Sequence, residues 1–91
     1  MAELLSDDEI EATLPSNWDR VDDEIVRVYE FGDYLEGADF AAECAEIAED
    51  EWHHPEIIIG YKTVEIRLTS HEEGGITDKD IEMAELFDDT R

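Results

Sequence analysis

Residues 57–68 read IIIGYKTVEIRL, and this stretch predicts the β-hairpin that decides the fold class. Its first half, through Tyr61, is rich in β-branched side chains, and Lys62-Thr63 then forms a tight connection. In the second half apolar and polar residues alternate, as expected for a strand with one buried face; the apolar positions are Val64, Ile66 and Leu68. Strands joined by so short a link pair antiparallel, so we expect a sheet built from hairpins.

The chain on either side of this hairpin predicts three helices and two further strands. Ser6-x-x-Glu9 has the form of a capping box that begins a short helix, and Thr77-x-x-Asp80 begins the last helix. Apolar residues recur at helical spacing from residue 34 to about residue 50. The expected order is helix to about residue 13, strands 18–21 and 24–31, helix 34–50, strands 57–61 and 64–69, and a helix after Thr77. Residues 1–91 are thus expected to form one α+β domain with two layers, in which helices cover one face of a four-stranded antiparallel sheet.

Residues 24–31 carry apolar side chains on both faces of their predicted strand. Ile25 and Tyr29 share one face, whereas Val26 and Val28 share the other. We therefore expect the second face of the sheet to be covered as well, and another copy of the chain is the candidate cover.

The net charge of −22, from 28 acidic and 6 basic side chains, excludes several classes of function. A broad basic face cannot be built, so binding to nucleic acid or to anionic membranes is not expected. The acidic residues are spread along the whole chain, and their mutual repulsion is screened at ~1 M salt, where the Debye length is about 3 Å. We interpret the charge as adaptation to a salty cytoplasm; an acidic partner-binding or DNA-mimic protein is the alternative.

The cysteine count and the amino terminus bear on the compartment. Cys44 is the single cysteine and cannot form an internal disulfide, so we expect a small buried apolar side chain there. No apolar run reaches ~18 residues, and residues 1–6 lack a basic n-region. These features predict a cytoplasmic protein without a membrane span.

The three histidines, His53, His54 and His71, form the candidate functional cluster. If the strands of the central hairpin pair, the start of one and the end of the other lie side by side, which brings His71 close to the histidine pair. Three interpretations are open: a chance surface cluster, a zinc site with Glu49 or Asp80 as the fourth ligand, and a general acid–base pocket.

The stretch EDEWHHPE at 49–56, followed by Tyr61, Thr69-Ser70-His71 and GITxxD at 75–80, resembles the pterin-4a-carbinolamine dehydratase family. The likeness extends upstream to LPxxW at 14–18 and RxYxFxD at 27–33. The resemblance implies an α-β-β-α-β-β-α fold, assembled as dimers or dimers of dimers.

The resemblance also implies a reaction and a set of site residues. The reaction removes water from a 4a-hydroxytetrahydropterin to give quinonoid dihydropterin, and it requires no metal, nicotinamide or flavin cofactor. By analogy with the family positions, His53 and His54 act as acids at the 4a-hydroxyl, and His71, aided by Asp80, accepts the N5 proton. The remaining assignments are substrate binding by Glu49 and Tyr61, and positioning of the histidine pair by Pro55.

Some positions also fit other roles. Asp80 can simply cap the last helix, and Tyr61 can belong to the core. Trp52 stands where a small polar residue is common in the family, so its ring either forms a wall for the pterin or blocks it. Ile57-Ile58 replaces the Trp-Phe of some members.

Two other functions stay open beside catalysis: a non-catalytic pterin-binding or dimerisation module, and a role in molybdopterin-related metabolism. The intact set of Glu49, His53, His54 and His71 favours the enzyme.

Overall fold

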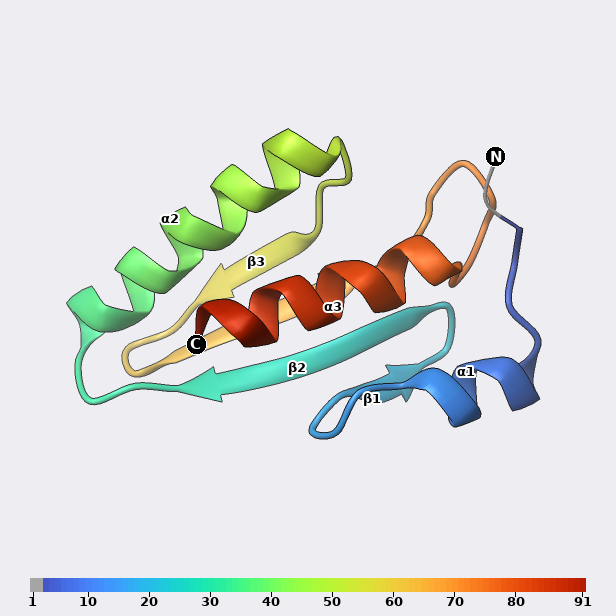
Figure 1. Cartoon of the computed structure of the whole chain (residues 1–91). Coiled ribbons are helices and arrows are strands. Elements are labelled where there is room, and N and C mark those ends of the chain that lie inside the picture. Colours follow the sequence, from blue (N-terminus) through green and yellow to red (C-terminus); the bar gives the residue numbers. More distant parts are fainter. Residues whose placement is uncertain (1–2) are drawn as a thin grey trace.

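The elements follow one another in the order predicted from the sequence (Figure 1). The structure is a computed structural model that describes residues 3–91; Met1 and Ala2, part of the amino-terminal stretch considered above, lie outside the described residues. The elements are α1 (Asp7–Thr13), β1 (Asp19–Val21), β2 (Glu24–Glu30), α2 (Tyr34–Glu51), β3 (Glu56–Ile59), β4 (Thr63–Leu68) and α3 (Asp78–Thr90).

The strands form one antiparallel sheet in the order β1-β2-β4-β3, which confirms the predicted fold class. In the β3–β4 hairpin, Glu56 lies opposite Arg67 and Ile59 lies opposite Val64. The connection differs slightly from the prediction. Thr63 is the first residue of β4 because its carbonyl accepts a hydrogen bond from the Gly60 N–H at 2.8 Å, so Tyr61 and Lys62 form the turn.

Helices α1 and α3 begin with the capping boxes that the sequence predicts. The Ser6 side chain and Glu9 form a capping box at α1, and Thr77 and Asp80 form another at α3. At α2 the Asp33 carboxylate accepts a hydrogen bond from the Glu36 N–H at 2.8 Å. These contacts satisfy backbone donors that the first turn of a helix leaves free.

Helices α2 and α3 lie side by side over one face of the sheet, and the core fills the space between the layers (Figure 1). The alternating residues of β4 point into it, as predicted, and the Cys44 side chain is fully buried. The core side chains include Ile25, Tyr29, Val64, Ile66 and Leu68 from the sheet, Phe40 and Cys44 from α2, and Met83 and Phe87 from α3.

The opposite face of the sheet carries exposed apolar side chains. Val28 is 50% exposed and Ile58 is 46% exposed, whereas Val26 is buried. The described single chain therefore leaves part of the apolar second face of β2 open to solvent.

Trp18 is the main departure from the expected elements. The sequence predicts it as the first strand residue, but β1 begins at Asp19, after Asn17 with a positive φ of 74°. The Trp18 ring is buried, and its indole N–H donates to the Asp88 carboxylate near the end of α3.

None of the helices between residues 3 and 91 combines the length and apolar composition needed to cross a membrane.

Candidate active site

Two separate stretches of backbone meet at one end of the β3–β4 hairpin. His53 and His54 lie in the link between α2 and β3, and His71 follows β4 in a turn. Because β3 and β4 are antiparallel, the start of one and the end of the other lie together. A pocket of about 380 Å³ opens there, lined by Trp52, His53, His54, Thr69, Ser70, His71, Glu72, Glu73 and Lys79. The structure thus brings the three histidines to a single pocket.

The end of α2 sets the direction of the histidine pair. Trp52 adopts the left-handed conformation, with φ 51° and ψ 49°, and its N–H donates to the carbonyls of Ala48 and Glu49. The His53 N–H donates to the Ala48 carbonyl at 3.0 Å. These bonds end the helix and turn the chain sharply, and Pro55 then leads it into β3.

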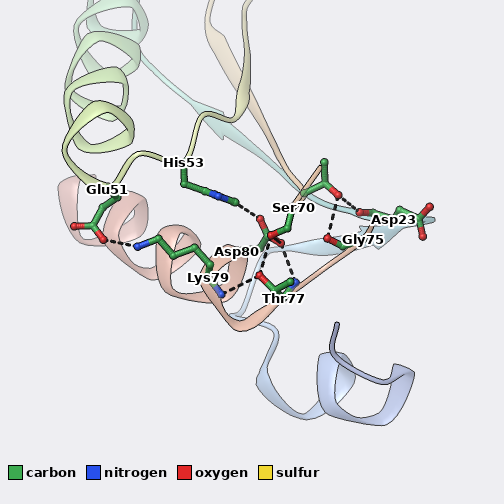
Figure 2. A network of polar contacts seen from close by, with 9 residues as sticks. Asp23, Glu51, His53, Ser70, Gly75, Thr77, Lys79 and Asp80 are labelled. Carbon is green, nitrogen blue, oxygen red and sulfur yellow. Dashed lines mark hydrogen bonds and ion pairs between the residues drawn. The ribbon is translucent and has the colours of Figure 1, made fainter. Parts of the chain in front are cut away.

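Asp80 contacts the side chain of His53 (Figure 2). The Asp80 side chain is fully buried, and its Oδ1 lies 2.6 Å from Nε2 of His53. Its Oδ2 accepts hydrogen bonds from the Thr77 N–H at 2.9 Å and from the Ser70 hydroxyl at 2.8 Å. Asp80 therefore caps α3 and supports a site histidine at the same time, so the two interpretations of this residue are compatible.

In the hydrogen bonds around Asp80, each donor and acceptor can be assigned in only one way. The Lys79 N–H donates to the Thr77 hydroxyl oxygen at 3.2 Å, and the hydroxyls of Thr77 and Ser70 lie 2.8 Å apart. Since the Ser70 proton goes to Asp80, the Thr77 hydroxyl donates to Ser70. The Asp80 carboxylate accepts every bond, so His53 carries its proton on Nε2, which leaves Nδ1 as the nitrogen that can accept another proton.

The pairing of Asp80 differs from the expectation that it aids His71. Asp80 lies in the first turn of α3 and contacts His53, whereas His71 is exposed in the turn after β4. The carboxylate thus contacts His53, and not His71, because the docking of α3 decides which histidine it can reach.

Glu49 contacts the second histidine of the pair. Its Oε1 lies 2.9 Å from Nε2 of His54, and both side chains are well exposed. Glu49 belongs to the last turn of α2 and reaches His54 just past the helix end. It is thus placed at the rim of the site through His54.

Tyr61 and Pro55 do not line this pocket. Tyr61 is 75% exposed in the turn between β3 and β4, at the opposite end of the hairpin from His71. Pro55 is half-buried in the link that carries the histidine pair. The structure therefore brings Glu49, Asp80 and the histidines together, but leaves Tyr61 outside the group.

Sequence reasoning missed the part that Ser70 plays. Its hydroxyl is buried between Thr77 and Asp80, and the only signal was its position in the Thr69-Ser70-His71 motif. The ion pair between Lys79 and Glu51, at 2.6 Å, was also not foreseen; it ties the start of α3 to the end of α2 at the edge of the pocket.

Within residues 3–91, no group of three or more histidine, cysteine, aspartate or glutamate side chains is arranged to hold a metal ion. The zinc interpretation of the histidine cluster therefore lacks a ligand set in this part of the chain.

Comparison with known proteins agrees with the fold and the motif. Residues 3–90 match the family model described as "Pterin 4 alpha carbinolamine dehydratase". A relative from Natronomonas pharaonis, named "Putative pterin-4-alpha-carbinolamine dehydratase", is 56% identical over 98% of this chain and 97% of its own.

Two solved structures resemble the chain. A Brucella melitensis protein described as a "transcriptional coactivator/pterin dehydratase" has a TM-score of 0.88 and 33% identity, covering 94% of this chain and 96% of its own. A pterin dehydratase-like protein, identified as a RuBisCO assembly factor in the alpha-carboxysome, has a TM-score of 0.65 and 22% identity, covering 80% of this chain and 84% of its own. The second likeness is one of fold alone.

Proposed function

The chain belongs to the pterin-4a-carbinolamine dehydratase family, and we propose that it removes water from a 4a-hydroxytetrahydropterin to give a quinonoid dihydropterin. The C4a–O bond breaks and the hydroxyl leaves as water after it receives a proton. N5 loses its proton, and its electron pair forms the C4a=N5 double bond. No electrons pass to another molecule, so one proton donor and one proton acceptor are sufficient.

The observation that carries this proposal is the convergence of three imidazoles on a pocket of about 380 Å³, with one of them backed by a fully buried carboxylate. Imidazole can donate and accept protons near neutral pH, and placed acid–base groups typically accelerate a reaction by about 10²–10⁴-fold. A pocket of this size lies within the usual range for small-molecule sites.

We assign the proton acceptor to His53. Its Nε2 is held by Asp80, which leaves Nδ1 as the ring nitrogen that accepts the N5 proton in this assignment. The negative carboxylate stabilises the imidazolium that forms when the proton arrives. In this assignment His54 and His71 donate at the 4a-hydroxyl, Glu49 positions His54, and Pro55 positions the pair. This revises the family-based order, in which His71 was the base.

The direct test is an assay of 4a-hydroxytetrahydropterin dehydration by the purified protein in molar KCl. Replacing His53, His54 or His71 by Ala is expected to lower the rate about tenfold or more while the protein stays folded. Tyr61→Phe is the matched control, because Tyr61 lies outside the pocket, and it is expected to keep the wild-type rate. Wild-type activity in the His53→Ala, His54→Ala double variant would overturn the mechanism.

We further propose that the protein assembles as a homodimer or homotetramer and acts in the cytoplasm. The half-exposed Val28 and Ile58 on the open sheet face support a contact between copies. Light scattering with Val28→Lys as the variant tests this assembly; the charged side chain is expected to reduce the measured mass. A monomeric mass measured for the wild-type protein would contradict the proposed assembly.

A non-catalytic pterin-binding or dimerisation module is the second candidate function. The buried Asp80–His53 contact favours catalysis, because a module that only binds has no need for an imidazole with a fixed proton position. Binding of pterin without turnover would favour the module instead.

A further inference from the structure

Trp52 combines three features that packing within the chain does not explain. It is the residue that ends α2, and its φ of 51° lies in the left-handed region that bulky side chains avoid. Its side chain is 77% exposed, so burial of the ring does not compensate for this strain. The ring also lines the pocket that holds the three histidines. Backbone strain combined with exposure at a pocket is typical of a residue kept for function.

The indole ring of Trp52 contacts His54, and both residues line the pocket. The ring centroid lies 4.9 Å from that of His54, and the two planes are nearly perpendicular at 83°. One face of a large aromatic ring thus remains available beside the histidine pair. A flat heteroaromatic ring placed against that face would be nearly perpendicular to the His54 imidazole. An N–H lying in the plane of this imidazole could then meet a hydroxyl that projects out of the ligand ring.

We propose that the Trp52 indole is the wall on which the pterin ring stacks, which makes Trp52 a residue that determines affinity and specificity for flat bicyclic substrates. The inference rests on the proposed function and deepens it. The other side chains that line the pocket include the carboxylates of Glu72 and Glu73, which offer little attraction to an uncharged ring. Stacking on an aromatic face depends little on ionic strength, so it suits binding in a salty solution.

The experiment compares two substitutions that differ in whether an aromatic ring remains at position 52. Trp52→Phe keeps an aromatic face, and Trp52→Asn removes it while tolerating the left-handed conformation. Titration calorimetry in molar KCl measures the affinity of each variant for oxidised biopterin, and steady-state assays measure kcat and KM. Thermal unfolding followed by circular dichroism checks that each variant is folded; the exposed position makes this the expected result.

We expect Trp52→Asn to weaken biopterin binding about tenfold or more and to raise KM similarly, with a much smaller change in kcat. Trp52→Phe is expected to stay close to the wild type. Equal affinity of the wild type and Trp52→Asn would overturn the stacking inference and leave the proposed function intact. If the wild type binds biopterin without dehydrating the substrate, the proposed function fails, whereas the stacking inference is still decided by the affinity of Trp52→Asn. If the wild type binds no pterin, both fail.

Discussion

At the scale of single residues, Asp80 is the most informative position because its two carboxylate oxygens bind different groups. Oδ2 closes the capping box of α3, and Oδ1 accepts from His53. In Asp80→Asn the amide oxygen can still accept at the cap, but the amide nitrogen would face His53 and favour the tautomer protonated on Nδ1. We expect the turnover number to fall by roughly one to two orders of magnitude with little loss of stability.

Asp33→Asn is the matched control for this substitution. Asp33 caps α2 at the end remote from the histidines, and Asn caps a helix about as well as Asp. Both variants remove one negative charge, so charge alone cannot separate them. Equal turnover in the two variants, measured with the dehydration assay, would remove Asp80 from the mechanism.

The buried thiol of Cys44 gives a prediction for alkaline pH. Burial raises its pKa from 9.0 to about 12, and burial together with the hydrogen bond to Asp88 raises the pKa of Tyr29. Above about pH 9 the unfolded chain loses a proton that the folded chain keeps, so the free energy of unfolding is expected to fall as the pH rises. Urea unfolding at fixed KCl between about pH 8 and pH 10 measures this loss. Cys44→Ala should show a shallower dependence on pH, and an equally steep one would contradict the assignment to Cys44.

At the scale of elements, the end of α3 is fixed to the sheet by Asp88. Its carboxylate accepts from the Trp18 indole at 3.0 Å, from the Arg27 guanidinium at 2.7 Å and from the Tyr29 hydroxyl. Asp88→Ala would leave a half-buried cation and two donors without their acceptor, so we expect a loss of about 2–4 kcal/mol in the free energy of unfolding.

The adjacent Asp89 supplies the control for Asp88, because it is exposed and carries the same charge. Asp89→Ala is expected to change stability by less than about 0.5 kcal/mol. Asp88 lies about 12 Å along α3 from Asp80, so turnover per folded molecule should survive Asp88→Ala. If Asp88→Ala is as stable toward urea as Asp89→Ala, the three contacts of Asp88 contribute little to the free energy of unfolding.

Elements whose signals are local could be predicted from the sequence. The caps at Ser6 and Thr77 and the alternation in β4 need only neighbouring residues, and all were confirmed. Hairpin pairing also predicted that His71 would meet the histidine pair, because antiparallel strands fix which ends adjoin.

Contacts between distant elements could not be predicted in this way. Whether Asp80 reaches His53 or His71 depends on how α3 docks on the sheet. His53, the residue that it contacts, is 27 residues away along the chain. The burial of Trp18 depends in the same manner on Asp88, 70 residues away. Tyr61 stands at the position that the family motif predicts in the sequence. In the structure it lies in the turn at the far end of the hairpin, away from the pocket.

At the scale of the whole molecule, the charge of −22 should make folding depend on salt. The relative from Natronomonas pharaonis comes from a halophilic archaeon, which agrees with this interpretation of the composition. Dilution of KCl from the molar range is expected to unfold the chain as repulsion between carboxylates is unscreened. Far-ultraviolet circular dichroism during the dilution measures the midpoint.

A variant with fewer acidic residues tests the cause of this dependence. Glu43 and Glu46 are exposed on α2, away from the ion pairs described above, so their replacement by Lys should shift the midpoint to lower KCl. A wild-type chain that stays folded and active in dilute buffer would contradict adaptation to salt and favour the acidic partner-binding alternative.

The hairpin of β3 and β4 has its pocket at the open end and its two-residue turn at the closed end. Extra residues inserted at Tyr61-Lys62 would therefore extend into solvent without disturbing the histidines. Deleting a single residue within β4 would instead invert the side-chain alternation of the strand and swing His71 away from its companions. The two ends of one small hairpin thus differ in evolutionary freedom: lengthening is permitted at the turn, while the register beside the pocket is constrained.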